Sequence, residues 1–283
     1  MAASPARPRS ESAKTDQLVD QLALEVRRTL ENASRDQVHD LRVAARRLGQ
    51  MVAVLDGAGG MGKIRRKLKQ TIARAGAVRD CDIAAKLTAK LHAPARLEAR
   101  LRRRRSLAER ELAAHLRELS EAGFADQWRA KLATENGALD AAERRVLLRA
   151  AHRVFRRAAN IDGPPTALHK LRIAAKKLRY TMELLPFPPA RLDPIKQLQS
   201  KLGDINDYES ARRLAAKEGA SKTLMKGLEQ AQEKKVRQFR RYWKREFAGK
   251  EQGWMAILTH PRTPGPAEVK PAPAASFGRV SKR

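Results

Sequence analysis

Apolar residues recur every three or four positions along most of the chain, the spacing of α-helices that bury one face. Breakers rich in Gly, Pro, Ser and Asn divide this pattern into ten predicted helices. They span residues 15–32, 35–56, 62–75, 79–91 and 94–121, and then 139–159, 165–185, 192–202, 206–218 and 221–247. Ala, Leu, Arg, Lys and Glu dominate these segments, which favours helix over strand. We therefore predict an all-α protein.

The two series of predicted helices form an internal repeat. The segments "VHDLRVAARRLGQMVAVL" and "LHKLRIAAKKLRYTMELL" lie 130 positions apart, and "KQTIARAGAVRDCDIAAKL" parallels "KQLQSKLGDINDYESARRL" at an offset of 127. Two matches in the same order predict a tandem duplication, with repeats at about 14–122 and 139–247. Each repeat is expected to be a helical bundle that hides its apolar faces.

The two ends of the chain differ from the region between them. Residues 1–13 and 248–283 are rich in Pro and have almost no periodic apolar pattern, so we expect disorder on both sides of a domain at 14–247. The N-terminal segment lacks the apolar run of a secretory signal, and no stretch reaches the roughly 18 apolar residues of a membrane span. The single cysteine, Cys81, excludes an intramolecular disulfide and is expected to be buried. A cytoplasmic protein without a membrane span follows.

The charge of the chain points to a partner. Sixty Lys and Arg residues against 31 Asp and Glu leave a net charge of +29. Such an excess is more than solubility requires, and its self-repulsion opposes folding. The composition therefore predicts a polyanionic partner.

Basic side chains form rows on one side of several predicted helices. In the first repeated helix, Leu41, Ala45, Leu48 and Val52 make the apolar stripe, and a basic row lies nearly opposite. The predicted rows are Arg35, His39, Arg42 and Arg46; Lys63, Arg66, Lys67 and Arg74; Arg145, Arg149, His152 and Arg156; and His169, Arg172, Lys176 and Arg179. Together with Arg47 and Lys201, these residues are predicted to form a wide cationic surface.

A solvated helix face is the alternative interpretation of such rows. Solvated faces usually alternate in sign and gain from Glu–Lys pairs one turn apart, whereas three of the four rows contain no acid. Only residues 97–116 interleave Glu with Arg, and there we favour the solvated face. Arg grips phosphate oxygens in a bidentate fork. Histidine adds a donor, and a polyphosphate would raise its pKa, so we expect binding to weaken between about pH 6 and pH 8.

The repeated motifs resemble the CHAD family, the conserved histidine α-helical domain. The resemblance lies in "HDLRVAARRL" and in "HKLRIAAKKLRY", which continues to Glu183, with "GAVRDCDIAAKL" and "LGDINDYESARRL" downstream. It covers about residues 14–247. It implies two four-helix bundles related by a pseudo-two-fold axis, a basic surface that binds inorganic polyphosphate, and association with polyphosphate granules.

Residue by residue, the resemblance assigns one signature to each repeat. The first would be His39, Arg42, Arg46 and Arg47, and the second His169, Arg172, Lys176 and Arg179. Gly49 stands where the second repeat has Arg179, so the two halves are expected to contribute unequally. Some CHAD modules are joined to a CYTH domain marked by ExExK. That motif is absent here, which would make this a stand-alone CHAD protein.

Other site chemistry is weakly supported. The six histidines show no HExxH spacing, and Cys81 has no partner for a catalytic pair. Asp80 with Asp82, and Asp204 with Asp207, could hold Mg²⁺, but each pair follows a glycine, and we interpret them as caps of restarting helices. The stretch "DGAGGMGK" does not satisfy the phosphate-loop pattern and is predicted to be an interhelical loop. We therefore expect no metal, no cofactor and no enzyme.

Non-catalytic binding of inorganic polyphosphate is the leading hypothesis. Nonspecific nucleic-acid binding of the nucleoid type is the main alternative, because charge alone does not distinguish phosphate polymers. The basic rows lack interleaved aromatic residues, and no helix-turn-helix is evident, which disfavours this alternative. An enzyme acting on polyphosphate is the third hypothesis, since cationic channels also serve phosphoryl transfer. No pattern in the sequence indicates an oligomeric state.

Overall fold

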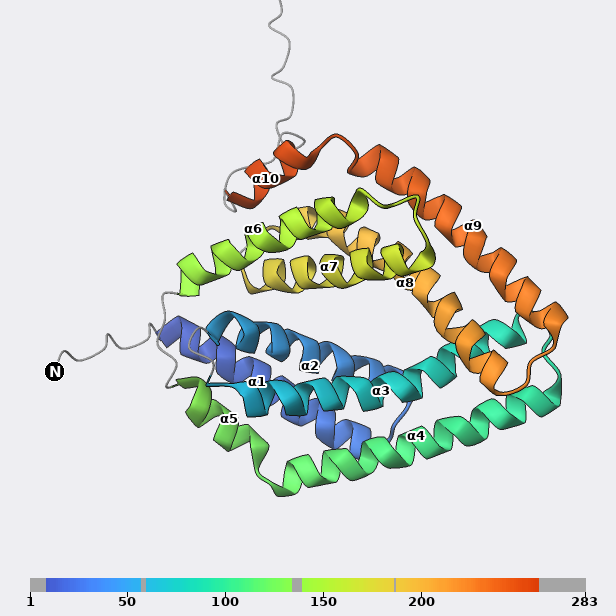
Figure 1. The fold of residues 1–283 in the computed structure, drawn as a ribbon. Helices are drawn as coiled ribbons and strands as arrows, with labels where there is room; N and C mark the ends of the chain where they lie inside the picture. Colours follow the sequence, from blue (N-terminus) through green and yellow to red (C-terminus); the bar gives the residue numbers. More distant parts are fainter. Residues whose placement is uncertain (1–8, 57–59, 134–138, 186, 260–283) are drawn as a thin grey trace, which may run out of the picture.

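The computed structural model describes residues 9–56, 60–133, 139–185 and 187–259, and these form ten helices (Figure 1). The first half contains α1 (Arg9–Glu31), α2 (Arg35–Leu55), α3 (Gly62–Ala89), α4 (Ala95–Glu121) and α5 (Phe124–Ala133). The second half contains α6 (Leu139–Ala158), α7 (Pro165–Leu184), α8 (Pro189–Lys217), α9 (Lys222–Glu246) and α10 (Glu251–Thr259). The prediction of an all-α protein is confirmed.

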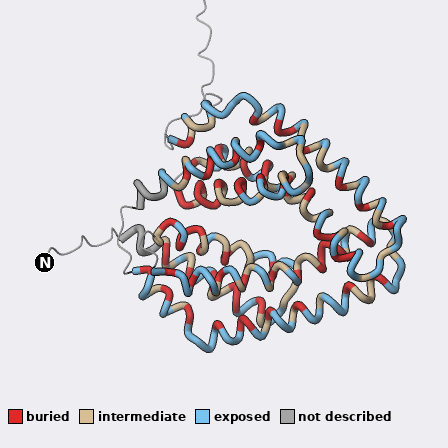
Figure 2. The backbone as a smooth tube through the Cα atoms, in the orientation of Figure 1, coloured by how far each residue is buried: buried red, intermediate tan, exposed pale blue. Residues whose placement is uncertain are grey.

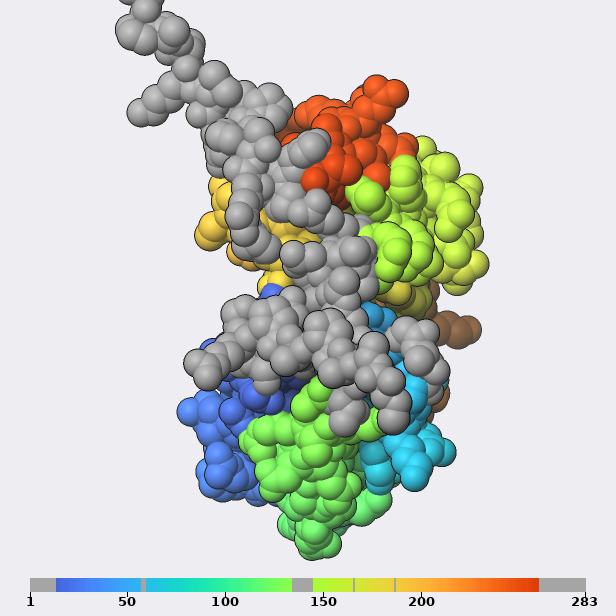
Figure 3. Space-filling model, turned by 90° about the vertical axis from the view of Figure 1, so that its left-hand side faces the viewer, coloured from blue at the N-terminus to red at the C-terminus, as the bar shows by residue number. Residues whose placement is uncertain are grey.

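The two halves share one arrangement. In the first, α2 packs on α1 and α3, α3 packs on α4, and α5 covers α1; in the second, α7 packs on α6 and α8, α8 packs on α9, and α10 covers α6. Figure 3 shows them as two lobes, the first half below and the second above. The halves meet through α3 with α8 and α2 with α7. The predicted tandem duplication with pseudo-two-fold symmetry is therefore confirmed.

Each lobe has its own apolar core, and a third core joins them. The predicted stripe of α2 is buried in the first core, and its equivalents on α7, Leu171, Ala175 and Leu178, are buried in the second. The third core lies where α3, α4, α8 and α9 converge, and it includes Cys81 and Leu214. Figure 2 shows that buried residues lie on the sides of the helices that face one another. Each of the long helices α3 and α8 thus contributes both to the core of its own lobe and to the third core, which joins the two lobes.

The helix breaks predicted after Gly76 and Gly203 are wrong. Helix α3 runs without interruption for 28 residues and α8 for 29. A glycine inside a helix costs only about 1 kcal/mol relative to alanine. Burial of the flanking residues, such as Val78 in α3 and Leu202 in α8, outweighs that cost.

Because α3 and α8 are continuous, the aspartates that follow the glycines are not caps. Asp80 and Asp82 lie within α3, and Asp204 and Asp207 lie within α8, with no helix start near them. Their side chains pair with basic residues instead. Asp82 accepts a hydrogen bond from Arg105, and Asp204 accepts one from Lys235. The capping interpretation is therefore wrong.

Two short helices that the sequence pattern did not reveal complete the lobes. Helix α5 packs on α1, and α10 lies within the segment 248–283 that was expected to be disordered. Trp254 of α10 stacks on Phe247, with the ring centroids 5.1 Å apart, so this expectation is corrected for residues up to Thr259. Helix α1 likewise begins at Arg9, inside the predicted N-terminal tail. Residues 1–8 and 260–283 lie outside the described ranges.

Capping residues account for several other helix ends. Ser34 and Ser221 accept hydrogen bonds from the backbone N–H groups of Gln37 and Leu224, both at 3.2 Å, which caps α2 and α9. Helix α8 ends just before Gly219, whose φ of +72° is a conformation that favours glycine. The predicted loop at 56–63 lies partly outside the described residues.

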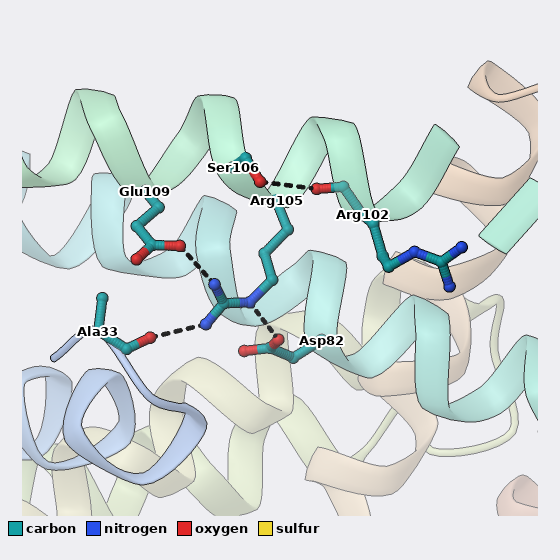
Figure 4. Close-up of polar contacts among 6 residues, drawn as sticks. All are labelled: Ala33, Asp82, Arg102, Arg105, Ser106 and Glu109. Carbon is teal, nitrogen blue, oxygen red and sulfur yellow. Dashed lines mark hydrogen bonds and ion pairs between the residues drawn. The ribbon is translucent and has the colours of Figure 1, made fainter. Parts of the chain in front are cut away.

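Arg105 ties three elements of the first lobe together, although residues 97–116 were interpreted as a solvated face. Its guanidinium donates to Asp82 of α3 at 2.8 Å, to the carbonyl of Ala33 before α2 at 2.6 Å, and to Glu109 of its own helix (Figure 4). The side chain of Asp82 is only 9% exposed. The neighbouring Arg102 is exposed and pairs with Glu98, as a solvated face predicts.

None of the described helices is long and apolar enough to cross a membrane.

Candidate anion-binding groove

A groove of about 750 Å³ lies between the two halves and is lined by α2, α3, α7 and α8. It brings together two of the four predicted basic rows, one from each repeat. Its cationic and titratable basic residues are His39, Arg42 and Arg46 of α2, Arg79 of α3, His169, Arg172, Lys176 and Arg179 of α7, and Lys196 and Arg213 of α8. We call this surface the central groove.

The helical repeat explains why these rows face each other. Helices α2 and α7 turn their apolar stripes into their own lobes, so the opposite, basic sides point toward the interface. The two helices touch near their C-terminal ends, where Gln50 donates a hydrogen bond to Thr181 at 3.0 Å. An apolar contact of Met51 and Val54 with Leu184 lies beside it. These contacts fix the separation of the two rows.

The cations of the central groove repel one another. Burial, together with neighbouring Arg46, lowers the pKa of Arg42 to about 10. Burial and then Arg46, Arg172 and Arg42 lower the pKa of Lys176 to about 6. The pKa of Arg172 is also lowered, mainly by burial. An anion placed among these groups would relieve their mutual repulsion.

Two arginines at equivalent positions have unpaired buried donors. The Nε atoms of Arg42 and Arg172 are buried and have no hydrogen-bond partner among the described residues. A buried donor without a partner costs about 1–3 kcal/mol, and the cost rises for a charged group. The same cost is thus paid in both repeats, at the two arginines of the repeated motif. An oxyanion supplies the acceptor that these groups lack.

Acidic residues from α3 and α8 also enter the central groove. Asp80 and Asp207 occupy equivalent positions, and burial raises the pKa of both carboxyl groups, against the opposing effect of neighbouring arginines. Asp80 also pairs with Arg213 at 3.6 Å. The sequence analysis missed Arg79, Asp80, Asp207 and Arg213 as groove residues. Their signal was present in the second repeated motif, where Asp80 and Asp207 align, but the predicted helix break obscured it.

The two motif histidines lie in different surroundings. His169 Nδ1 is 2.9 Å from the side-chain oxygen of Asn206, so Nδ1 carries the proton and Nε2 remains for a ligand. Burial and then Arg79 lower the pKa of His39. His39 is therefore neutral at pH 7 in the unliganded protein. Lys176, with its pKa lowered to about 6, is therefore a stronger source of pH dependence near pH 7 than His39.

The structure does not bring the other predicted basic residues into the central groove. On α3, Lys67 pairs with Glu118 of α4, and Arg74 lies near His115 of α4. Lys201 lies over the ring of Tyr242, 5.0 Å from its centroid. The remaining ones outside the groove are Arg35, Arg47, Lys63, Arg66, Arg145, Arg149 and Arg156, all exposed. Arg35 lines a smaller neighbouring pocket of about 200 Å³. Four rows thus do not merge into one surface.

The two halves differ at the position of Gly49. Its equivalent, Arg179, lines the central groove and donates to Glu183 at 2.8 Å. Arg47 of the first half reaches the same carboxylate at 3.2 Å. Glu183 therefore holds one arginine from each repeat, and the second half supplies the extra groove cation.

No group of three His, Cys, Asp or Glu side chains in the described residues is placed to hold a metal ion.

Comparison with protein families agrees with this architecture. The family model for the CHAD domain matches residues 13–216, most of the chain. The chain belongs to the CHAD domain family. Among solved structures, the CHAD domain from the plant Ricinus communis matches with a TM-score of 0.64 and 18% identity, covering 94% of this chain and 95% of that one. PptA from Streptomyces chartreusis matches with a TM-score of 0.54 and 19% identity, covering 81% of this chain and 97% of that one.

The TM-scores show that the CHAD chain shares a fold with both structures. No curated protein matches it. The resemblance inferred from the two repeated motifs is confirmed, and CHAD domains are helical domains associated with polyphosphate-related proteins.

Proposed function

We propose that this CHAD domain binds inorganic polyphosphate in the central groove, without catalysis, in the cytoplasm and at polyphosphate granules. One observation carries the proposal: the basic rows of the two repeated motifs converge from opposite sides on one groove. A linear chain of phosphates places an oxyanion beside each turn of both helices. It would supply acceptors to Arg42 and Arg172 and relieve the repulsion around Lys176.

The groove favours polyphosphate over nucleic acid. None of the residues that line it is Phe, Tyr or Trp, so it offers no aromatic platform on which bases could stack. Its volume of about 750 Å³ is too small to take in a duplex. Polyphosphate has neither sugars nor bases to accommodate and carries charge on every unit. Electrostatic capture along the groove is thus independent of any sequence and sensitive to salt.

Competition tests this choice of ligand. Labelled long-chain polyphosphate is bound to the protein at about 150 mM salt and then challenged with unlabelled polyphosphate or duplex DNA, compared per phosphate. We expect polyphosphate to displace the label at much lower concentration than DNA. Equal displacement would favour the nucleic-acid alternative.

We propose that the central groove is not catalytic, because its acidic side chains lie beside its basic side chains and balance their charge. Asp80 pairs with Arg213, and Asp207 lies near Arg79 and Arg172. The complex is incubated with and without Mg²⁺, and orthophosphate is measured over time. No release above the protein-free control is expected. Steady release that His39→Ala abolishes would establish an enzyme instead.

Binding is predicted to take up a proton through Lys176. In the free protein its pKa is about 6, so it is mostly neutral at pH 7.5; a bound anion raises this pKa toward the ordinary range. Affinity should therefore rise by up to about tenfold per pH unit as pH falls through the window between the bound and free pKa values, and level off below about pH 6. Titration calorimetry at pH 7.5 in buffers of different ionisation enthalpy measures the proton uptake.

Lys176→Arg is the control for this prediction. An arginine keeps its charge throughout the window, so the pH profile should flatten while binding at pH 6 persists. His39 also faces the groove, but its lowered pKa confines its own contribution to more acidic pH. An unchanged slope in Lys176→Arg would show that Lys176 is not the group that takes up the proton.

A further inference from the structure

A second cavity, of about 410 Å³, adjoins the central groove at the start of α7. Its walls include Thr166, His169 and Lys170 of α7, Asn206 and Glu209 of α8, and Gln232 of α9. We call it the side pocket. It shares His169, Asn206, Glu209 and Arg213 with the central groove, so the two spaces lie on either side of these residues or beside them.

The side pocket combines an apolar floor with a polar rim. Leu168, Leu202 and Ile205, which belong to the core of the second lobe, form the floor. Glu209 stands at the rim with 53% of its side chain exposed, and it accepts a hydrogen bond from Gln232 at 3.1 Å. This volume lies within the range of small-molecule sites, which are typically apolar with a few placed polar groups.

The equivalent space in the first lobe is smaller: its pocket of about 200 Å³ is lined by Arg79, Asp82 and Lys86, the counterparts of Asn206, Glu209 and Arg213. Helices α4 and α9 align at an offset of 127, which places Arg105 at the position of Gln232, and Asp82 at that of Glu209. Arg105 extends past Asp82 to the carbonyl of Ala33 and so spans this corner (Figure 4). Gln232 is shorter and stops at Glu209 and the carbonyl of Ile205. The larger opening is therefore a property of the second repeat, and the fold does not require it.

A flat, partly apolar ring carrying N–H donors fits these walls. The floor accepts a ring face, and the Glu209 carboxylate accepts hydrogen bonds from an amino group on the ring edge. Phosphates attached to that ring would continue past His169 toward Arg213 and Arg172 in the central groove. We propose that the side pocket binds the base of a nucleoside polyphosphate whose phosphate chain lies in the central groove. This proposal rests on the proposed function only in that the central groove holds the phosphates.

ATP and inorganic tripolyphosphate test the side pocket, each titrated into the full-length protein without Mg²⁺. Tripolyphosphate carries the higher charge, so electrostatic attraction alone would make it the tighter ligand. Contact of the base with the side pocket should reverse the order and make ATP about tenfold tighter. Tighter or equal binding of tripolyphosphate overturns the inference and leaves polyphosphate binding intact. Failure of both ligands to bind overturns the inference and the proposed function together.

Two variants close the side pocket in different ways. Gln232→Arg installs the arginine that the first lobe has at this position, Arg105. Thr166→Trp places an aromatic ring at the mouth of the side pocket, and because Thr166 is exposed this substitution does not disturb the core. Each should remove the tenfold preference for ATP while tripolyphosphate still binds. The matched control is Asp36→Trp, since Asp36 is the equivalent of Thr166 in the first lobe, where the pocket is smaller. Its ratio of affinities should equal that of the wild type; a preference that survives Thr166→Trp, or is lost in Asp36→Trp, overturns the assignment.

Discussion

Replacing Arg42 and Arg172 together by methionine is expected to weaken polyphosphate binding by at least about 100-fold, because each charge-assisted contact contributes about 1.5–3 kcal/mol. The same double variant should make the unliganded protein more stable. The Nε atoms of both arginines are buried without a partner among the described residues, and burial lowers the pKa of both groups, so the folded state carries their charge at a cost. An apolar side chain of similar volume removes that cost, and a gain of about 1 kcal/mol is expected. Ligand titration and urea denaturation measure the two effects.

The control for this prediction is Arg66→Met with Arg149→Met. These residues belong to basic rows that the structure leaves outside the central groove, and both are exposed. Removal of two exposed charges should weaken binding less than about threefold at physiological salt. An equal loss in the control would mean that the whole basic surface, and not the groove, captures the ligand.

Arg105→Ala is expected to lower the free energy of unfolding by about 3 kcal/mol, because removal of its cation leaves the buried carboxylate of Asp82 uncompensated. Asp82 would remain almost fully buried without its cation, and the carbonyl of Ala33 would lose its donor. Urea denaturation followed by circular dichroism measures the loss.

Arg102→Ala provides the comparison on the same helix. Arg102 is 68% exposed and pairs with Glu98 at 3.7 Å, so its loss should cost less than about 0.5 kcal/mol. Asp82→Asn in the Arg105→Ala background should recover part of the stability, because a buried neutral amide is less costly than a buried carboxylate. A loss no larger than that of Arg102→Ala would contradict the proposed link between α4, α3 and the start of α2.

The sequence predicted the two basic rows of the central groove because they are local properties of α2 and α7. A helical wheel separates the core stripe from the opposite side, and both repeats show the same separation. The groove residues that come from α3 and α8 do not follow from a local sequence pattern. Asp80 and Asp207 reach it only because both helices continue past a glycine, and packing at the junction core decides that.

Tertiary packing also explains why some predicted basic rows remain outside the central groove. Lys67 and Arg74 form as regular a basic row as Arg42 and Arg46, but α3 packs between α2 and α4, and this row turns toward α4. The direction of a row depends on which neighbours cover the helix, which periodicity does not specify. Helix α10 was missed because its nine residues precede a Pro-rich segment whose composition dominated the interpretation.

The pseudo-two-fold relation of the two rows has a consequence for ligand polarity. A site built from two copies of one row presents nearly the same groups when approached from either end. Linear polyphosphate has no chemical direction, so both orientations of the chain make equivalent contacts. A nucleic-acid strand, with distinct 5′ and 3′ ends, gains nothing from that equivalence. The halves differ at Gly49 and Gln232, and only a ligand with two unlike ends would be held there in a single orientation.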